Sequence, residues 1–314
     1  MNSPSNNSDV STSFKLNASA ATCSSKSVTA MGYSFDSSSD TTEISNQSID
    51  RNISASTGTH TLHVKAWSAG HSCVTDVIVN VKAVSASADE VPSDAATVSN
   101  IETMSDWSAH HDTAGSGDAS GATDVVSTPS KYGSARRFVT KFKNNGDERY
   151  SRNFSDDVES KNFFYDAWVY LNSTADHLAN LEMDVNQVMA NGKTVLVGMQ
   201  CDGWTGNWAY TVNTGSASNV KPKWVSKSGT SCNPRSWTRD AWHHVQFSFS
   251  RDDSGNIQYK SVWLDGKKTA INESAFGAAD LGWDPTIKTQ FQVDGYGSDN
   301  SVTVFLDKLT ISRW

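Results

Sequence analysis

Short runs of alternating apolar and polar residues, separated by clusters of Ser, Gly and Asn, recur along this chain. Examples are FKLNAS, THTLHVKAWS, FYDAWVYL, HVQFSFS and VTVFLDKLTIS. A period of two over such short lengths is typical of half-buried strands. No stretch shows the 3.6-residue period of an amphipathic helix, and charged residues make up only 19% of the sequence. We therefore predict an all-β protein.

The strand candidates fall into two groups, which suggests two domains in a chain of 314 residues. After a polar tail at residues 1–10, the few short strands of residues 11–84 suit a small sandwich. Residues 85–97 have the polar, Pro-interrupted composition of a linker. Residues 98–314 hold all but one of the 11 tryptophans and many more strand candidates, which predicts a larger antiparallel sandwich.

The four cysteines divide two and two between these groups, Cys23 with Cys73 and Cys201 with Cys232. Neither pair has the CxxC spacing of a zinc site. An even count that is split by domain predicts two disulfides and an oxidising compartment.

Charge and hydropathy exclude two classes of partner. A formal net charge of -8 leaves no basic face for a phosphate backbone, so we do not expect nucleic acid as a partner. No apolar run is long enough to cross a bilayer, and the start of the chain lacks the basic and apolar regions of a signal peptide. We interpret Met1 as a start that replaces a removed signal peptide, although a cytoplasmic protein would begin in the same way. We expect no membrane partner.

Two segments resemble known folds. The phrase GTHTLHVKAW at 58–67 resembles the penultimate strand of bacterial Ig-like domains of secreted enzymes. The phrases WHHVQF at 242–247, DDSGN at 252–256 and VWLDG at 262–266 resemble the concanavalin A-like lectin/glucanase superfamily, and VFLDKLTI at 304–311 is similar to its closing strand. The resemblance implies a small Ig-like sandwich followed by a larger antiparallel jelly roll, in which 242–266 form a hairpin.

Side-chain parity separates a polar face from an apolar one along each strand of the second group. On the strand near residue 184, Glu182, Asp184 and Asn186 take the polar parity. The same parity on other strands is taken by Trp168, Tyr170, Gln200, Asp202, His244, Gln246, Gln292 and Asp294. If these strands are neighbours, one concave face presents this whole set, which suits the hydroxyls and C–H faces of sugars. The alternative is an ordinary solvated outer face.

Tryptophans outside regular strands are further binding candidates. Trp204 and Trp208 lie between Cys201 and Cys232 among Gly, Asn and Ser, and a braced loop would hold their rings rigidly. By contrast, strand context assigns Trp242, Trp263 and Trp314 to the core.

The segment from Glu182 resembles the Glu-x-Asp-x-x-Glu strand of laminarinase-like and cellobiohydrolase-like glycosidases. The resemblance implies that Glu182 is a nucleophile and Asp184 a helper carboxylate. The last position is Gln187, which cannot act as an acid and which parity places on the opposite face. Asp202 or Asp294 would have to supply the acid, or His244 would act as the base of a lyase.

Metal and cofactor signals are weak. The acidic segment 252–256 lacks the later Glu of an EF-hand loop, so it is interpreted as a turn. The resembled superfamily often carries structural calcium, for which Glu102 and Asp307 are candidate ligands. We leave a structural calcium ion open and expect that no cofactor is required.

Three hypotheses follow. The first is a secreted bacterial protein, monomeric, that binds a polysaccharide on the concave face of the jelly roll. The alternative is a retaining endo-glycosidase or a lyase that acts on a β-linked polysaccharide at the same face. The third is an adhesin or structural surface protein without a sugar ligand.

Overall fold

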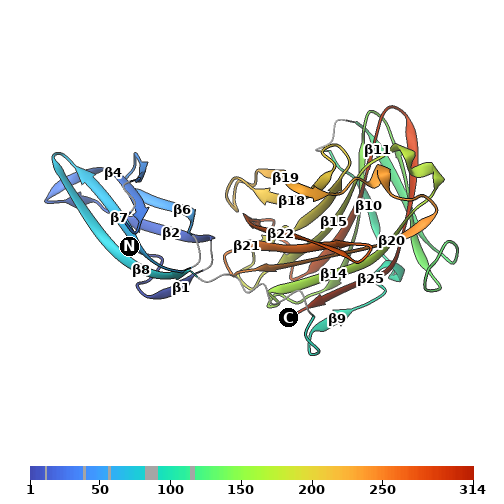
Figure 1. Cartoon of the computed structure of the whole chain (residues 1–314), viewed down its shortest axis with the longest axis horizontal. Helices are drawn as coiled ribbons and strands as arrows, with labels where there is room; N and C mark the ends of the chain where they lie inside the picture. The colour runs from blue at the N-terminus through green and yellow to red at the C-terminus, as the bar shows by residue number, and fades with distance from the viewer. Residues whose placement is uncertain (11–12, 38–39, 56–57, 82–90, 114–116) are drawn as a thin grey trace. The chain divides into compact units, whose positions relative to one another are not determined.

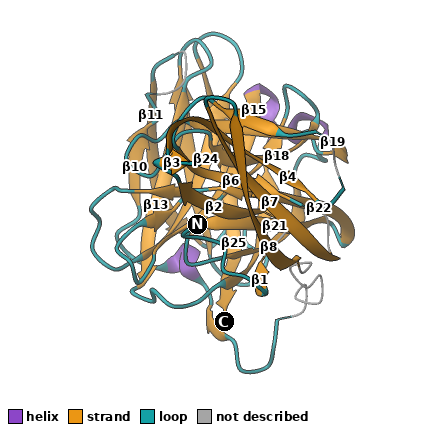
Figure 2. Ribbon diagram, turned by 90° about the vertical axis from the view of Figure 1, so that its left-hand side faces the viewer, coloured by secondary structure: helices purple, strands orange, loops and turns teal. Residues whose placement is uncertain are grey.

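The structure, a computed structural model, describes residues 1–314 except 11–12, 38–39, 56–57, 82–90 and 114–116. In this described part, strands dominate and the helical segments are the short 3-10 turns η1 (Ile101–Thr103), η2 (Ser173–His177) and η3 (Pro234–Ser236) (Figure 2). No helix among the described residues is long and apolar enough to span a membrane. The prediction of an all-β protein is confirmed.

The chain forms two compact units, Met1–Ser87 and Ala88–Trp314. Residues 85–90 of the predicted linker lie outside the described residues. The last two linker positions, Ala96 and Thr97, belong to β9 (Ala96–Val98), which pairs with β25 (Asn300–Arg313) of the second unit. The first strand contact of the second unit therefore lies slightly before residue 98.

The first unit is a small two-layer sandwich (Figure 1). One sheet has the order β1-β8-β7-β4-β3, with β5 on β4, and the other consists of β2 and β6. The bounds are β1 (Ser8–Val10), β2 (Ser13–Ser19), β3 (Thr22–Cys23), β4 (Lys26–Phe35), β5 (Thr42–Ile44), β6 (Ser48–Ser54), β7 (Gly58–Ser68) and β8 (His71–Val81). Leu16 and Ile49 of the smaller sheet share one core with Leu62 and Val79 of the larger sheet. The likeness of this unit to Ig-like domains stays a prediction.

The predicted polar tail at residues 1–10 is wrong in its second part. Ser8–Val10 form β1, which pairs in parallel with β8. Asn2 and Ser3 also donate backbone N–H groups to the carbonyl of Asn17. The side chains gave no strand signal here, because a backbone can pair with a sheet edge whatever polar side chains it carries.

The second unit consists of two large antiparallel sheets (Figure 1). The nine-stranded sheet contains β10 (Ser108–His111), β13 (Asp147–Ser155), β24 (Ile287–Gly295), β15 (Leu178–Val188), β17 (Gly198–Asp202), β18 (Asn207–Asn213) and β19 (Pro222–Ser231) in this order, with β16 (Thr194–Val195) and β23 (Ala278–Ala279) at one side. The eight-stranded sheet contains β11 (Ala119–Val126), β12 (Ala135–Phe142), β25, β14 (Asn162–Leu171), β20 (Ala241–Arg251), β21 (Asn256–Leu264) and β22 (Lys267–Phe276), with β9 beside β25.

Alternating apolar side chains of both sheets fill the space between them. Rings stack within the eight-stranded sheet, as Tyr165 does on Phe247 at 4.7 Å between centroids. Phe138 of that sheet packs against Phe291 of the other sheet at 5.0 Å. The two sheets therefore form one continuous core, as expected for a sandwich.

The hairpin implied for residues 242–266 is confirmed. Strands β20 and β21 pair antiparallel, with Val245 opposite Leu264. Asp252 accepts hydrogen bonds from the backbone N–H groups of Ser254 and Asn256 across the turn. The acidic residues there act as turn residues, as predicted.

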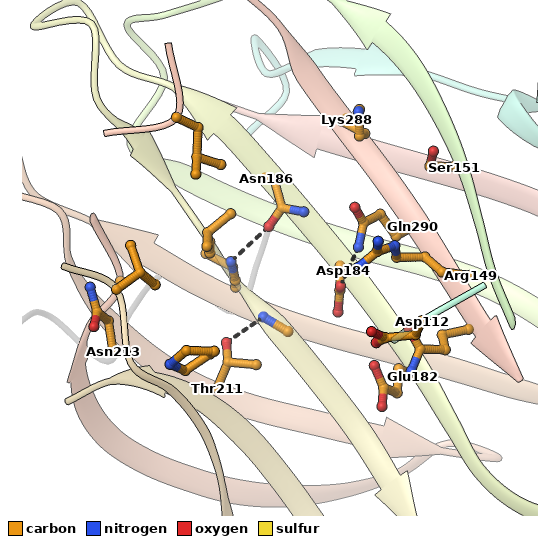
Figure 3. Close-up of a pocket in the computed structure, with 18 of the residues that line it drawn as sticks. Asp112, Arg149, Ser151, Glu182, Asp184, Asn186, Thr211, Asn213, Lys288 and Gln290 are labelled. Atoms are coloured by element: carbon orange, nitrogen blue, oxygen red, sulfur yellow. Dashed lines mark hydrogen bonds between the residues drawn. The ribbon is translucent and has the colours of Figure 1, made fainter. Parts of the chain in front are cut away.

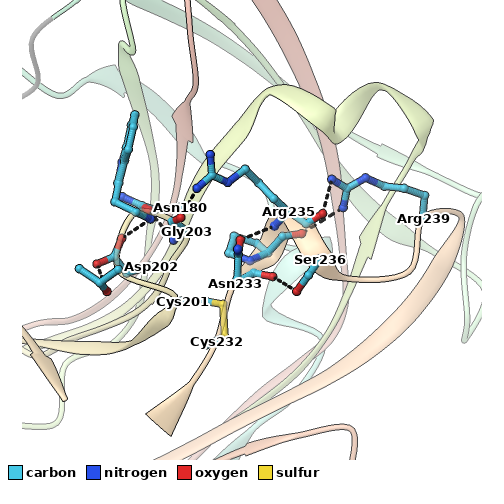
Figure 4. The surroundings of a disulfide bond; sticks show 12 residues. Asn180, Cys201, Asp202, Gly203, Cys232, Asn233, Arg235, Ser236 and Arg239 are labelled. Atoms are coloured by element: carbon cyan, nitrogen blue, oxygen red, sulfur yellow. Dashed lines mark hydrogen bonds between the residues drawn. A yellow bond between two sulfur atoms is a disulfide. The ribbon is translucent and has the colours of Figure 1, made fainter. Parts of the chain in front are cut away.

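Both predicted disulfides are present. Cys23 is bonded to Cys73 in the first unit and Cys201 to Cys232 in the second. The second bridge joins the core-facing side of β17 to the residue that follows β19 (Figure 4). It therefore fixes the β18–β19 hairpin to the middle of the nine-stranded sheet.

Replacing Cys201 and Cys232 with alanine should lower the free energy of unfolding of the second unit by about 3–4 kcal/mol, because the bridge closes a loop with a separation of 31 residues. Denaturant titration followed by tryptophan fluorescence measures this, since all but one of the 11 tryptophans lie in this unit. The matched control replaces Cys23 and Cys73 and should leave that fluorescence transition in place. An unchanged transition in the first variant would contradict the expectation.

Candidate binding site

A cavity of about 530 Å³ lies on the nine-stranded sheet. Strands β10, β13 and β24 line one side of β15, and β18 and β19 line the other. Gly277, Leu281 and Trp283 add a wall from the segment before β24. Figure 3 shows Asp112, Arg149, Glu182, Asp184 and Gln290 gathered in one part of this cavity.

Alternation along β15 directs its apolar side chains into the core and Glu182, Asp184 and Asn186 to the cavity. Antiparallel pairing places Glu182 between Gln200 of β17 and Gln292 of β24. The predicted polar positions of these three strands thus lie on one face. Glu182 lines the cavity, but the surrounding protein leaves only 6% of it exposed.

A hydrogen-bonded pair of carboxyl groups lies beside this row. Glu182 bonds to Asp294, which also accepts hydrogen bonds from Asn180 Nδ2 at 3.0 Å and Gln292 Nε2 at 3.1 Å. Two carboxylates in contact cannot both be ionised at low cost, so the pair holds a proton between them.

Burial raises the pKa of each acid in this cluster. The pKa of Glu182 lies well above its ordinary value, first because the group is buried and then because Asp294 and Asp184 are near. Burial likewise raises the pKa of Asp184 to about 7 and that of Asp147 to about 8, the latter with help from the charge of Asp294. At neutral pH several of these groups therefore carry protons and can donate as well as accept hydrogen bonds.

Two buried acceptors on this face of the sheet have no partner. Gln290 Nε2 donates to Asp184 Oδ2 at 2.8 Å, but Asp184 Oδ1 receives no hydrogen bond. Gln200 is 4% exposed and its Oε1 is also unpaired. A Cβ at Gly198 would lie 2.7 Å from Asp184 Oδ1, so a larger residue would clash with this carboxyl group. Unpaired buried acceptors are rare in folded proteins, and both of these atoms are covered by the protein around them.

Aromatic and cationic side chains line the rest of the cavity. Trp224 comes from β19, and its ring would lie 2.8 Å from a Cβ at Gly198. Lys288 Nζ lies over the Trp283 ring, 4.4 Å from its centre. Arg149 of β13 also lines the cavity, and its charge lowers the pKa of Asp184 against the larger effect of burial.

Two predicted polar residues of this face hold the backbone in place. Asn186 Oδ1 accepts the N–H of Val197 at 3.0 Å. Asp202 accepts the N–H of Trp204 at 2.8 Å and the hydroxyl of Thr205 at 2.6 Å. Asp202 therefore fixes the turn after β17, whereas Asn186 lines the cavity and orders its wall.

Four predicted residues do not join this face. Trp168 and Tyr170 lie on β14 and His244 and Gln246 on β20, which are strands of the eight-stranded sheet. The expectation of a single shared face is wrong for them, because parity identifies the outer side of a strand but not the sheet to which it belongs. In a sandwich the two outer faces have the same alternation.

The four residues instead contact one another and their neighbours. The Trp168 ring stacks on His244 at 4.3 Å, and Lys131 Nζ lies 3.9 Å from its centre. His244 and Gln246 both hydrogen-bond to Asp166. Tyr170, His244 and Gln246 therefore each have a hydrogen-bond partner within the protein.

The tryptophan assignments need correction. Trp208 is 2% exposed in the core, because the loop-like sequence around it forms β18 with Trp208 on the inner side, opposite Cys201. Trp242 and Trp263 are half-buried on the outer side of the eight-stranded sheet, and Trp314 is half-buried too, so none of the three belongs to the core. Trp204 is 52% exposed, as expected for a binding candidate.

Several cavity residues were missed by the sequence analysis: Asp112, Arg149, Trp224, Trp283, Lys288 and Gln290. Parity could have identified some of them, because Lys288 and Gln290 continue the polar side of Gln292, and Arg149 alternates with the buried Tyr150. The position of Trp283, outside any strand, gave no such signal.

The glycosidase-like motif is incomplete in the structure. Gln187 is 1% exposed, donates to the carbonyl of Asp157 and accepts from Arg251 Nε. It therefore serves a structural network on the side away from Glu182, as parity indicates. No residue of β15 takes the place of the missing acid.

Among the described residues, no group of three or more His, Cys, Asp and Glu side chains is arranged to hold a metal ion. Asp307 accepts hydrogen bonds from Ser130, Lys131 and Tyr132, and Glu102 accepts the N–H groups of Lys308 and Leu309. The two candidate calcium ligands thus hold loops and strands together through direct hydrogen bonds.

No model of a protein family matches this chain, and no curated protein matches its sequence. Among solved structures, alginate lyase vAL-1 from Chlorella virus is similar at 8% identity and a TM-score of 0.40, over 63% of this chain and 93% of that one. Arcelin-5, a lectin-like defense protein from Phaseolus vulgaris, is similar at 11% identity and a TM-score of 0.39, over 70% of this chain and 98% of that one. The family 11 carbohydrate-binding module of the cellulase Lic26A-Cel5E of Clostridium thermocellum is similar at 12% identity and a TM-score of 0.35, over 70% of this chain and 95% of that one.

The acid cluster predicts a pH dependence of stability. A carboxyl group with a raised pKa binds more protons in the folded than in the unfolded chain, so the free energy of unfolding falls as pH rises from about 4 to about 7. Glu182→Gln should remove part of this loss and raise the unfolding temperature at pH 7.5 relative to wild type, with little effect at pH 4. Thermal melts across this range measure the difference.

The control for this melt series is Asp299→Asn, which changes an exposed acid before β25. It should shift the curve little at any pH. If Glu182→Gln destabilised the protein equally at both pH values, Glu182 would not be held protonated in the folded state.

Proposed function

We propose that this protein is a secreted polysaccharide-binding protein and that the chain of sugars lies in the cavity on the nine-stranded sheet. The observation that carries the proposal is a cavity lined both by carboxyl and amide side chains, such as Glu182, Asp184 and Gln292, and by indole rings. The two disulfides support an oxidising, extracellular location.

Sugars match the chemistry of this cavity. Their hydroxyl groups donate hydrogen bonds to carboxylate and amide oxygens and accept them from protonated acids and amides. Glu182, Asp184 and Gln292 line the cavity with these groups. The C–H faces of sugars pack on aromatic rings, which Trp224 and Trp283 offer. The volume of about 530 Å³ lies within the range of ligand pockets and holds part of a chain.

The geometry favours binding over glycoside hydrolysis. A retaining glycosidase places its two carboxyl groups about 5–5.5 Å apart, so that one attacks the sugar while the other protonates the leaving group. Here the buried carboxyl groups of Glu182 and Asp294 interact directly with each other instead of flanking an open space. A nucleophile must also be ionised, whereas burial raises the pKa of Glu182.

The proposal predicts retention of the protein on at least one polysaccharide without release of product. Trp224→Ala should weaken that binding about tenfold, because a stacking ring is worth roughly 1 kcal/mol or more. Gln292→Met keeps the side-chain volume but removes a polar group that lines the cavity, and it should weaken binding as well. Affinity electrophoresis on a panel of soluble polysaccharides, with reducing and unsaturated ends assayed in parallel, measures both effects.

Trp168→Ala is the matched control, since it removes an indole from the eight-stranded sheet and should leave affinity unchanged. Failure of the wild-type protein to bind any polysaccharide would reject the proposal in favour of a structural role. Release of new chain ends that stops in Glu182→Gln would instead show an enzyme.

A further inference from the structure

Trp204, Tyr296 and Arg235 form a cluster outside the cavity described above. The Trp204 and Tyr296 rings lie 5.2 Å apart and are 52% and 41% exposed. The Arg235 guanidinium lies 4.8 Å from the centre of the Tyr296 ring and 5.7 Å from that of Trp204. We propose that this cluster is a second subsite, which binds an acidic sugar unit of the same polysaccharide chain; this rests on the proposed function.

The two rings meet over the start of β15 from opposite sides. Trp204 lies in the turn after β17, and Tyr296 directly follows β24, the two strands that flank β15. The preceding residue of the turn, Gly203, donates its N–H to Asn180 Oδ1, and the N–H of Tyr296 is bonded to the carbonyl of His177. Both rings are therefore anchored to the beginning of the strand that carries Glu182.

The cluster is held rigidly although its rings are exposed. Asp202 binds the N–H of Trp204, and Cys201 beside it is bonded to Cys232 (Figure 4). Arg235 reaches from η3 and donates to the carbonyl of Gly203. A platform fixed before binding loses little conformational entropy when a ligand arrives, which favours affinity.

The chemistry of Arg235 selects the class of sugar. Its guanidinium has five N–H donors, of which one is bonded to Gly203, and the described residues offer it no carboxylate partner. The neighbouring Arg239 differs, because it pairs with Asp176 and with several backbone carbonyls. A planar cation beside two exposed rings fits a pyranose that bears a carboxylate or sulfate group.

The cluster is in line with the cavity. The polar row of β15 runs from Asn180 to Asn186, which is about 20 Å along a strand. Trp204 and Tyr296 lie near the Asn180 end, and Lys288 with Trp283 lies at the Asn186 end, where Lys288 pairs with Asn186 across the strands. Each end of the row thus combines an aromatic ring with a cation. A linear chain with repeated acidic units, such as a polyuronate, fits this pattern.

The test compares acidic and neutral chains on the full-length protein. Titration calorimetry at neutral pH measures binding of oligogalacturonides, alginate oligosaccharides and neutral β-glucan oligosaccharides of increasing length. Arg235→Gln should weaken binding of long acidic chains about tenfold and change binding of neutral chains little. Trp204→Ala should weaken binding of long chains and leave short ones, which fill only the cavity, unaffected.

Arg235→Lys keeps a charge and should retain part of the affinity for acidic chains. Its melting curve shows whether losing the hydrogen bond to Gly203 destabilises the protein, which separates that effect from a loss of contact with the ligand. Tyr132→Ala is the control, because Tyr132 is an exposed ring, 56% accessible, beside β25 of the eight-stranded sheet. It should change no affinity.

The results distinguish the subsite from the function on which it rests. If Trp224→Ala weakens binding while Trp204→Ala and Arg235→Gln do not, the cavity binds polysaccharide and the second subsite is wrong. If wild type binds neutral chains more tightly than acidic ones, the acidic class is wrong. If it binds no chain at all, the proposed function fails and the subsite with it.

Discussion

The packing of Leu181, Met183 and Val185 against the opposite sheet determines the geometry of the candidate site. These three side chains are almost fully buried in the core, so β15 cannot shift its register by one residue without exposing all of them. Because side chains alternate along a strand, the same packing directs Glu182, Asp184 and Asn186 to the cavity. The neighbouring strands β17 and β24 then supply Gln200 and Gln292 at the level of Glu182.

The buried acids show that this face is not optimised for stability. Burial raises the pKa values of Glu182, Asp184 and Asp294, and each raised pKa represents free energy lost near neutral pH. Apolar or amide side chains at these positions would avoid that loss. Clusters of perturbed acids in a cavity are a common property of functional sites, which is consistent with a site that exchanges hydrogen bonds with a ligand.

The aromatic residues of the second unit serve three different purposes. Trp208 fills the core, and Trp168 stacks on His244 in a satisfied network on the eight-stranded sheet. Trp224 and Trp283 line the cavity, while Trp204 is exposed beside it. The abundance of indoles is therefore a weak guide to sugar binding by itself, and the argument for a site depends on which rings line the same cavity as polar side chains.

The sequence by itself determined the all-β class, the two disulfides, the β20–β21 hairpin and the direction of each side chain along β15. The class, the disulfides and the side-chain directions depend on local alternation and on a cysteine count, which can be read over short distances, whereas the hairpin was implied by the resemblance of residues 242–266 to a known superfamily. Only the tertiary structure decided that β14 and β20 belong to the opposite sheet, which separates Trp168 and His244 from Glu182. It also brought Asp294 into contact with Glu182 and Tyr296 to Trp204, across more than 90 residues of chain in each case. The physical reason is that alternation specifies the two faces of a strand, whereas strand order depends on long-range pairing and core packing, which leave no periodic trace in the sequence.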